Sequence, residues 1–476
     1  MNNTLFKPSI LAYPSPTPYA LYMPKEYDCL VIGAGSAGMV AASQAANMGA
    51  KVAITEKWKL GGDCPNRACV PTKALIHSSR LLTQMKQAEK FGLKADNVGF
   101  DWSKVQEWKD KVVAERTAHE SEEALKEQGI DLFWGVAAFV SPTEIKVKEK
   151  VLKTKKVIIT AGAKPAVFPI EGLDTVGYIT SNEAVELKEL PKSLIIVGAG
   201  AVGMEFAQIF HRFGVEVTVF EAAPHIIPAA DAETASALSG FLAKEGIKIH
   251  VGAKVQKFTK SGELKKATVD LGKGKVKDFG AEEIMMATGR APDLEGLNIK
   301  AARVETTSKG VIVDDTLKTG QSNIYAAGDI TGVMQFTHMA TYQAVYAAYN
   351  ALTTKEPVKV DYRVVPWVAF SDPEIAGVGT TEEKLKELGV KYRKSVFEFK
   401  NLGKSSTQAE YDGFVKLLVD ENDQILGSFI VGPEAGELIH EIVIAMAGKV
   451  TAKQVGDAIF AYPTWSETVG SAAAQV

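Results

Sequence analysis

The feature that most constrains the fold is a strand–turn–helix–strand unit near the N-terminus. An apolar run over 29–32 predicts a buried strand, and the glycine pattern G-x-G-x-x-G follows it over 33–38. An alanine-rich stretch then predicts a helix that ends at Gly49, and 51–55 predicts a second strand, closed by Glu56. Glycines in this context let backbone amides at a helix N-terminus approach a pyrophosphate, and Glu56 is placed to accept hydrogen bonds from a ribose. The unit therefore predicts a dinucleotide site.

The same order of elements recurs further along the chain. A strand is predicted over 194–197, the glycine pattern lies over 198–203, a helix is predicted over 204–213, and a strand over 216–220 is closed by Glu221. Two such units predict an α/β protein that binds two dinucleotides. The carboxylate of Glu221 repels a 2′-phosphate, and no arginine follows closely to receive one, which favours NAD over NADP.

Length and composition set the protein class. A chain of 476 residues is too long for one ordinary core, so two or three domains are expected. The net charge is −3 with no long basic run, which argues against nucleic acid or an anionic membrane as the main partner. Residues 1–25 form a proline-rich N-terminal extension without the pattern of a signal peptide or presequence, so a cytoplasmic location is expected.

Two of the three cysteines lie close together in GGDCPNRACVPTK, residues 61–73. Cys64 and Cys69 are placed to form a redox-active pair, with a helix dipole that lowers the thiol pKa. The alternatives are two buried apolar residues, a metal site, for which His77 is the only other nearby ligand, and a structural disulfide. Polar neighbours disfavour the first alternative, and no metal is expected. Cys29 lies within an apolar strand and is expected to be buried and inert.

Several motifs in this order resemble the pyridine nucleotide-disulfide oxidoreductases, a family that includes dihydrolipoamide dehydrogenase, glutathione reductase and mercuric reductase. GGDCPNRACVPTK resembles the redox-disulfide segment, MMATGRAPD (285–293) the linking motif, and NIYAAGDI (323–330) the second flavin motif. YRVVPWVAFSDPEIAGVG (362–379) resembles the entry to the dimerisation domain. The resemblance covers the chain from about residue 26 to the C-terminus.

The resemblance implies FAD in the first site, NAD(P)H in the second, and a homodimer whose active sites draw on both subunits. It also implies two Rossmann-like domains and a C-terminal α+β dimerisation domain. The expected boundaries are an FAD-binding domain over 26–160 and 289–358, an inserted NAD(P)-binding domain over 161–288, and the dimerisation domain over 359–476.

The same resemblance implies roles for individual residues. Hydride passes from the nicotinamide to the flavin, which reduces the Cys64–Cys69 disulfide. Cys69 then forms the charge-transfer thiolate near the flavin, and Cys64 attacks the substrate. Lys73 approaches the flavin and pairs with Glu205, and Asp329 binds the ribityl chain.

The predicted cofactor residues follow from the motifs. Those for FAD are Gly33, Gly35, Ser36, Ala37, Gly38, Glu56, Lys57, Gly62, Asp63, Lys73, Gly162, Asp329, His338 and Ala340. Those for NAD are Gly198, Gly200, Ala201, Val202, Gly203, Glu205, Glu221 and Gly289. For His338, a purely packing or capping role is an equally good interpretation.

The C-terminal segment departs from the family pattern. Where the disulfide reductases carry His-Pro followed by Ser-Glu, this chain reads AYPTWSE, so Tyr462 stands in place of the histidine base and Glu467 is retained. A tyrosine with a pKa of about 10 is a poor general base at neutral pH. His440 could replace it, although packing on a helix face is the better interpretation. A tyrosine in this segment is also a point of resemblance to the mercuric reductases. However, the C-terminal sequence SETVGSAAAQV lacks the vicinal cysteine pair of those enzymes.

Four functions are compatible with these observations. The leading hypothesis is an FAD enzyme that passes electrons from NADH through Cys64 and Cys69 to a small disulfide or thiol-reactive substrate, or oxidises a dithiol in the reverse direction. The alternatives are direct reduction of a quinone or oxygen by the flavin, mercuric-reductase-like metal reduction, and a low-turnover flavoprotein subunit of a larger complex. In the leading hypothesis Cys64, Cys69, Lys73, Glu205, Tyr462 and Glu467 are the candidate catalytic residues.

Overall fold

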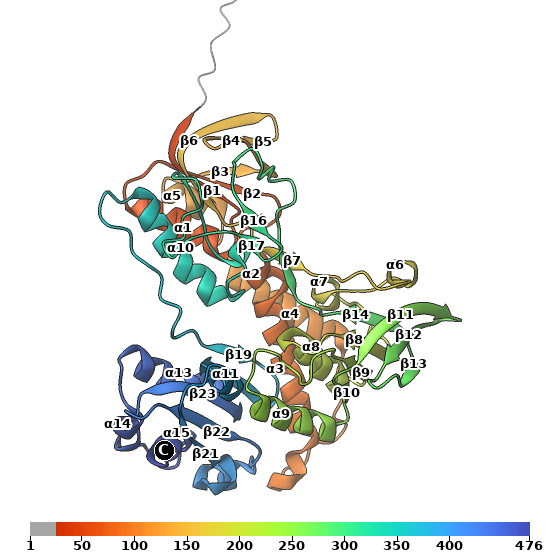
Figure 1. Ribbon diagram of the computed structural model, residues 1–476. Coiled ribbons are helices and arrows are strands. Elements are labelled where there is room, and N and C mark those ends of the chain that lie inside the picture. Colours follow the sequence, from red (N-terminus) through yellow and green to blue (C-terminus); the bar gives the residue numbers. More distant parts are fainter. Residues whose placement is uncertain (1–24) are drawn as a thin grey trace, which may run out of the picture.

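The structure, a computed structural model, describes residues 25–476. The N-terminal extension predicted over 1–25 therefore lies outside the described residues, apart from Lys25. The described chain forms three parts, each built around its own main sheet (Figure 1). We call them the first domain, the inserted domain and the C-terminal domain.

The first domain contains a sheet of order β3-β2-β1-β6-β5-β4. β1 (Glu26–Ile32) lies parallel between β2 (Val52–Glu56) and β6 (Lys150–Ile159). The short strand β18 (Ile324–Ala326) also pairs in parallel with β6, so a late segment completes a sheet that the first strand begins. The other elements are β3 (Asp131–Trp134), β4 (Ala137–Ser141), β5 (Glu144–Val147), α1 (Ser36–Asn47), α2 (Asp63–Arg67), α3 (Cys69–Lys86), α4 (Trp102–Thr117), α5 (Glu122–Glu127) and α10 (Thr337–Leu352).

The inserted domain lies between β7 (Ala163–Pro165) and β15 (Arg290–Pro292), which pair with each other in antiparallel fashion. Its parallel sheet has the order β10-β9-β8-β14, and a separate antiparallel sheet has the order β11-β12-β13. The elements are β8 (Ser193–Val197), β9 (Glu216–Phe220), β10 (Lys248–His250), β11 (Lys254–Ser261), β12 (Leu264–Asp270), β13 (Val276–Ala281), β14 (Glu283–Met286), α6 (Leu173–Val176), α7 (Ser181–Ala184), α8 (Ala201–Arg212) and α9 (Ala232–Glu245).

The C-terminal domain is built on an antiparallel sheet of order β19-β20-β23-β22-β21, and α13 and α15 pack against it through one apolar core. The elements are β19 (Trp367–Ala369), β20 (Glu374–Gly379), β21 (Arg393–Glu398), β22 (Phe414–Val419), β23 (Ile425–Gly432), α11 (Glu382–Glu387), α12 (Gly403–Gln408), α13 (Ala435–Ala447), α14 (Ala452–Gly456) and α15 (Glu467–Ala474).

Two two-residue strands, β16 (Thr306–Thr307) and β17 (Gly310–Val311), pair with each other in the segment that precedes β18.

The two glycine turns have matching geometry. Gly33 and Gly198 adopt φ values of +99° and +103°, which favour glycine. A Cβ on Gly38 would lie 1.7 Å from the carbonyl oxygen of Gly33, and one on Gly203 would lie 2.0 Å from that of Gly198. The third glycine of each motif therefore lets the first turn of the helix pack against the loop that precedes it. The helix of the second unit, α8, begins at Ala201, three residues before the predicted start.

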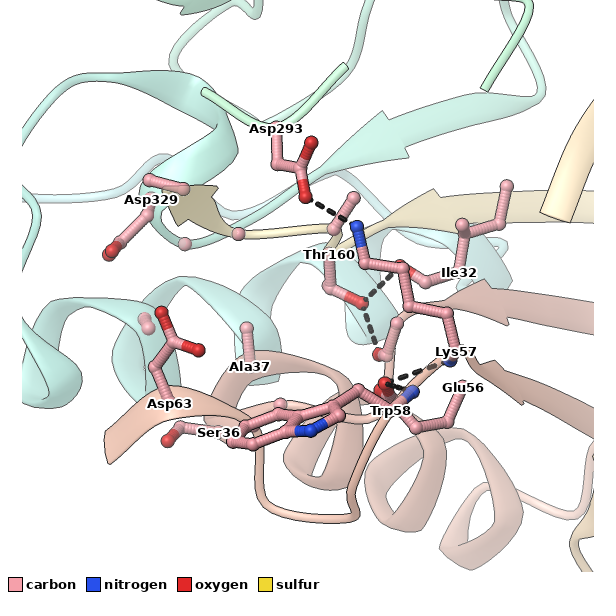
Figure 2. A pocket seen from close by; sticks show the side chains of 18 of the residues that line it. Ile32, Ser36, Ala37, Glu56, Lys57, Trp58, Asp63, Thr160, Asp293 and Asp329 are labelled. Atoms are coloured by element: carbon pink, nitrogen blue, oxygen red, sulfur yellow. Dashed lines mark hydrogen bonds and ion pairs between the residues drawn. The ribbon is translucent and has the colours of Figure 1, made fainter. Parts of the chain in front are cut away.

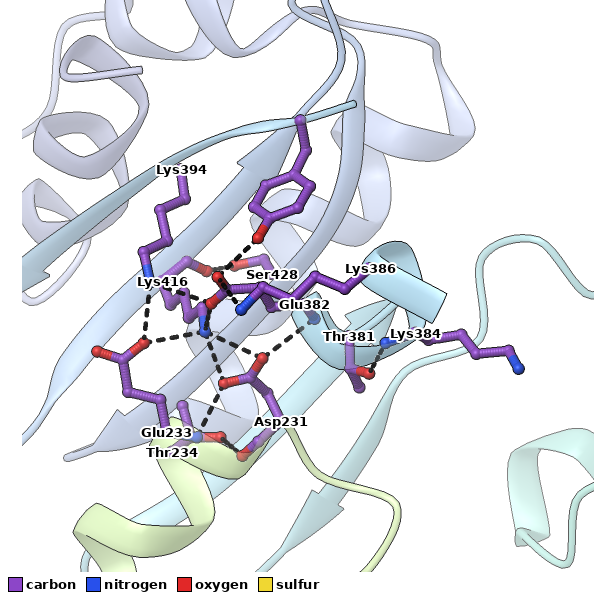
Figure 3. A network of polar contacts seen from close by, with 11 residues as sticks. Asp231, Glu233, Thr234, Thr381, Glu382, Lys384, Lys386, Lys394, Lys416 and Ser428 are labelled. Carbon is purple, nitrogen blue, oxygen red and sulfur yellow. Dashed lines mark hydrogen bonds and ion pairs between the residues drawn. The ribbon is translucent and has the colours of Figure 1, made fainter. Parts of the chain in front are cut away.

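A buried polar cluster joins the inserted and C-terminal domains (Figure 3). Lys416, on β22, is fully buried and forms ion pairs with Asp231 at 2.9 Å, Glu233 at 2.9 Å and Glu382 at 2.6 Å. Asp231 caps the N-terminus of α9, and Glu382 begins α11. Because the Lys416 ammonium is buried together with the carboxylates of Asp231 and Glu382, the cluster fixes how the two domains meet. Among residues 25–476, no helix is long and apolar enough to cross a membrane.

Candidate active site

A cavity lies at the carboxyl ends of the first domain's parallel strands, where open α/β sheets bind their ligands. The glycine turn lines one side of this cavity, and the segment after β18 lines another (Figure 2). Eleven of the predicted FAD residues line it: Gly33, Gly35, Ser36, Ala37, Glu56, Lys57, Gly62, Asp63, Gly162, Asp329 and Ala340. Gly38, Lys73 and His338 do not line it.

Glu56 ends β2 with its carboxylate fixed by backbone amides. One carboxylate oxygen accepts from the Ala34 N–H at 2.8 Å, and the other accepts from the Lys57 and Trp58 N–H groups at 2.8 and 2.7 Å. Lys57 pairs with Asp293 at 2.5 Å across the cavity. The carboxylate is thus held at the strand end, where the sequence places a ribose partner.

Asp63 and Asp329 lie at the opposite end of the cavity from Glu56 (Figure 2). Burial raises the pKa of Asp329, although the nearby Arg290 opposes this shift. The Arg290 guanidinium lies 2.7 Å from Asp63 and 3.6 Å from Asp329, and it donates to the Ala163 carbonyl at 2.6 Å. A glycine-lined turn at one end and polar side chains at the other fit a dinucleotide with a polyhydroxyl chain.

Arg290 and Trp58 are two lining residues to which the sequence analysis assigned no role. Arg290 is the arginine of the MMATGRAPD motif, so the motif itself was the available signal. Trp58 follows Lys57 directly, and the Arg67 guanidinium lies 4.1 Å from its ring centroid. Nothing in the local pattern around Trp58 predicts that contact, because Arg67 comes from α2 rather than from the strand end.

A second cavity lies at the carboxyl ends of β8 and β9 in the inserted domain. Among the predicted NAD residues, Gly198, Gly200, Glu221 and Gly289 line it, whereas Ala201, Val202, Gly203 and Glu205 do not. Glu221 repeats the geometry of Glu56, because its carboxylate accepts from the Ala199 N–H at 2.7 Å and from the Ala223 N–H at 2.8 Å. Phe168, Phe220 and Lys254 also line this cavity and were not predicted.

The two cysteines lie on two consecutive helices. Cys64 is the second residue of α2, and Cys69 is the first residue of α3. Between them Ala68 adopts φ −124° and ψ −100°, which interrupts the helix and lets the chain change direction. Both cysteines are free thiols. Cys64 lines the first cavity, whereas Cys69 contacts the hydroxyl of Thr337, another lining residue.

The two sulfurs have opposite acidities. The hydrogen bond from Cys64 lowers the pKa of Cys69 to about 6, and Lys73 and Thr337 also act in that direction against the effect of burial. The same pairing, together with burial, raises the pKa of Cys64. Cys69 is therefore the sulfur that holds the negative charge of the pair near neutral pH. Cys29 is fully buried in β1, and burial raises its pKa to about 12, which confirms its interpretation as an inert core residue.

Lys73 and Glu205 form the ion pair expected from the sequence. The Lys73 ammonium lies 3.0 and 2.8 Å from the two carboxylate oxygens of Glu205, which is almost fully buried on α8. Glu205 also accepts from the Phe370 N–H at 3.0 Å, and the Lys73 ammonium lies 4.6 Å from the Phe370 ring centroid. This small cluster joins all three domains beside Cys69.

The C-terminal candidates lie away from this cluster within one chain. The Tyr462 side chain is 76% exposed and does not line the cavity that contains Cys64. Glu467 accepts from the Thr464 N–H at 2.9 Å at the start of α15. His338 and His440 are exposed, and their ring nitrogens bond the backbone carbonyls of Pro366 and Gly436, both at 2.9 Å. No cluster of three or more possible metal-ligating His, Cys, Asp or Glu residues occurs within 25–476.

Comparison with known families accounts for almost the whole described chain. Residues 27–344 match the model of the pyridine nucleotide-disulphide oxidoreductases, and residues 365–473 match the model of the dimerisation domain of that family. The chain is 34% identical to a dihydrolipoyl dehydrogenase of Bacillus subtilis, over 95% of this chain and 98% of that protein. It is also 34% identical to a mercuric reductase of Staphylococcus aureus, over 94% of this chain and 82% of that protein.

A solved structure shows the same arrangement of domains. The flavoprotein disulfide reductase RclA of Escherichia coli, described as induced by HOCl, superposes with a TM-score of 0.83 at 27% identity. The match covers 94% of this chain and all of the RclA chain. The names of these relatives describe different activities, so membership of the family alone does not identify the substrate of this chain.

Proposed function

Because the chain belongs to the pyridine nucleotide-disulphide oxidoreductase family, we propose that it passes electrons from NADH through FAD to the Cys64–Cys69 pair and on to a small disulfide or thiol-reactive substrate. The single observation that carries this proposal is the placement of both free cysteines at the first cavity, where Cys64 lines it and Cys69 contacts the lining residue Thr337. The reverse reaction, oxidation of a dithiol, uses the same residues.

FAD bound in the first cavity supplies a two-electron carrier between the nicotinamide and the cysteine pair. The protein contributes the binding geometry: Glu56 for a ribose, the amides of the 33–38 turn for the pyrophosphate, and Asp329 for the ribityl hydroxyls. Lys73 places a positive charge beside Cys69, and Glu205 holds that lysine in position.

The exchange steps follow from the chemistry of the two thiols. In the reduced pair, the Cys64 thiol gives up its proton as its sulfur attacks one sulfur of the substrate disulfide, which forms a mixed disulfide and releases the first product as a thiol that carries this proton. The Cys69 thiolate then attacks the Cys64 sulfur, re-forms the Cys64–Cys69 disulfide and releases the second thiol. One NADH and one proton are consumed for each substrate disulfide reduced to two thiols.

We also propose NADH rather than NADPH as the electron donor. Glu221 presents a carboxylate at the end of β9, fixed by two backbone amides, where an incoming 2′-phosphate would meet its negative charge. Steady-state kinetics with each nucleotide test this choice. A higher kcat/KM with NADPH than with NADH would contradict it.

A homodimer is proposed from the match to the dimerisation domain. Two apolar side chains of the C-terminal domain, Ile444 and Ile459, are 71% and 100% exposed in the single chain, as expected for a surface that a second copy covers. In a dimer of this family, Tyr462 and Glu467 reach the cysteine pair of the partner chain. The weak basicity of Tyr462 favours substrates whose leaving thiol is already acidic, such as aromatic disulfides.

The test is NADH oxidation with a small aromatic disulfide as acceptor, with a quinone as the comparison. Cys64→Ser and Cys69→Ser are expected to abolish disulfide reduction, whereas Cys29→Ser, a change of a buried cysteine outside the pair, is expected to retain it. Quinone reduction that equals disulfide reduction and survives both changes would instead support direct electron transfer from the flavin.

A further inference from the structure

An arginine held against an aromatic ring forms part of the wall of the first cavity. Arg67, the last residue of α2, and Trp58, which follows β2, both line this cavity, and the Arg67 guanidinium carbon lies 4.1 Å from the centroid of the Trp58 ring. Figure 2 shows the ring extending from the strand end at Glu56 toward Ser36 and Asp63. Because a planar guanidinium stacks on an aromatic face, the ring sets the plane in which Arg67 presents its N–H groups.

Asp63 fixes one edge of this guanidinium. The Arg67 Nε and Nη2 atoms lie 2.9 and 2.8 Å from the same carboxylate oxygen of Asp63, and the other oxygen accepts from the Nη2 of Arg290 at 2.7 Å. Two guanidinium groups therefore share this one carboxylate. Within residues 25–476, the Nη1 group of Arg67 has no hydrogen-bond partner, so its N–H groups remain free to bind a ligand.

The backbone brings α2 against the glycine turn of the first domain. Gly61 donates to the Ala34 carbonyl at 2.8 Å, and a Cβ on Gly62 would lie 2.8 Å from the Cα of Gly35. Gly35 precedes α1 and Gly62 precedes α2, so the loops that enter the two helices pack directly on each other. Arg67 therefore stands on an element that is fixed to the turn whose amides suit a pyrophosphate.

The order of groups along the cavity places Arg67 beside the middle of the cofactor. Glu56 lies at the end that suits the adenosine ribose, and Asp329 lies at the end that suits the ribityl chain. Arg67 contacts Trp58, two residues after Glu56, and also Asp63, which lies with Asp329 at the opposite end. The pyrophosphate of FAD joins its ribose to its ribityl chain, so a cofactor that uses both ends carries its pyrophosphate past Arg67.

We propose that Arg67 is a ligand of the FAD pyrophosphate, and that Trp58 and Asp63 position its guanidinium for this contact. This inference rests on the binding of FAD in the first cavity, as proposed above. Amides at a helix N-terminus bind phosphate through partial charges, whereas a guanidinium adds a full positive charge and donors that match the spacing of phosphate oxygens. Arg67 therefore supplies the charge that the amides of the 33–38 turn lack.

The experiment measures the Kd of FAD for the flavin-free, full-length protein by isothermal titration calorimetry. Arg67→Met keeps an apolar side chain against Trp58 but removes the N–H groups, and it is expected to raise this Kd about 10- to 100-fold, the effect of losing hydrogen bonds from a charged group. Arg363→Met is the matched control, because it breaks an exposed ion pair with Asp361 away from the cavity, and it is expected to leave the Kd unchanged. An unchanged Kd in Arg67→Met overturns the proposal.

A double variant separates a phosphate ligand from a mere counter-ion of Asp63. If Arg67 only neutralised that carboxylate, adding Asp63→Asn to Arg67→Met would restore the wild-type Kd, and this result overturns the proposal. A phosphate ligand instead predicts that the double variant still binds FAD about tenfold or more weakly than Asp63→Asn alone. Arg67→Gln provides a second protein without the charge if the methionine variant does not fold, as judged by its thermal unfolding midpoint.

Two fragments of the cofactor locate the contact on the pyrophosphate. ADP keeps the two phosphates and adenosine lacks them, and each is measured in competition with FAD. Arg67→Met is expected to weaken ADP and to leave adenosine unchanged, whereas an equal loss for both fragments would mean a general disturbance of the cavity and overturns the proposal. Because these titrations use no NADH and no substrate, their failure leaves the electron path through Cys64 and Cys69 untouched. A wild type that binds no FAD would instead contradict the proposed function itself.

Discussion

At the scale of single residues, the site depends on how charge is distributed around two sulfurs. Lys73 lowers the pKa of Cys69 and Glu205 raises it, although the two side chains are paired with each other. A thiolate exists above its pKa, so a value of about 6 keeps Cys69 charged at neutral pH and protonates it as the pH falls through about 6.

Changes of the two charged residues are expected to move this pKa in opposite directions. Glu205→Gln leaves the lysine charge uncompensated and lowers the pKa of Cys69, whereas Lys73→Met leaves a buried carboxylate and raises it, each by about one unit. Lys86→Met, an exposed change on the same helix, serves as the control and is expected to have no effect. The pH profile of thiol alkylation measures all three, and shifts of the same sign for Glu205→Gln and Lys73→Met would refute the electrostatic account.

At the scale of elements, the glycine turns decide where cofactors bind. Gly38 lies within the first turn of α1, where helix propensity alone favours alanine by about 1 kcal/mol. The Gly33 carbonyl leaves no room for a Cβ at this position. Packing and helix propensity therefore oppose each other at Gly38. Packing dominates, because an added Cβ would lie only 1.7 Å from the Gly33 carbonyl oxygen.

Gly38→Ala is expected to lose FAD binding and to lower the thermal unfolding midpoint. Gly240→Ala is the matched control, because Gly240 lies within α9 and a Cβ there meets nothing within 4 Å. That change is expected to be neutral or to stabilise the protein by up to about 1 kcal/mol. The flavin-to-protein absorbance ratio of the purified variants measures the first effect, and a normal ratio in Gly38→Ala would show that the turn tolerates the side chain.

At the scale of the whole molecule, a cluster of buried charges fixes how the inserted and C-terminal domains meet. Burial alone lowers the pKa of Lys416, but its bonds to Glu382, Asp231 and Glu233 raise it above its usual value. Burial alone raises the pKa of Glu382, yet hydrogen bonds from Lys416, Lys386 and Tyr392 hold it well below its usual range. The stability that Glu382 contributes is therefore complete above its ordinary pKa of about 4.3 and is lost as the pH falls below that value.

Lys416→Met is expected to cost about 3–5 kcal/mol of stability, because it leaves buried carboxylates without their partner. Lys453→Met removes one side of the exposed Lys453–Asp457 pair and is expected to cost less than about 1 kcal/mol. Calorimetric unfolding of both variants tests the comparison. Equal midpoints for the two variants would mean that the cluster does not hold the domains together.

The sequence predicted the local units well and the long-range contacts in part. Both glycine turns and their strands are visible as short local patterns, and the pairing of Lys73 with Glu205 followed from a family resemblance. The contact of Thr337 with Cys69 and the Lys416 cluster were not predicted. Thr337 and Cys69 are 268 positions apart, and Lys416 and Asp231 are 185 positions apart, so no local pattern encodes these contacts.

The most direct test of the central claim is anaerobic titration with NADH of the wild type and of Cys64→Ser. If the cysteine pair carries electrons, the wild type takes up two electron pairs per flavin, its two thiols become open to alkylation, and the variant takes up only one pair. If one electron pair fully reduces both proteins and alkylation does not change, the cysteines stand outside the electron path and the claim is wrong.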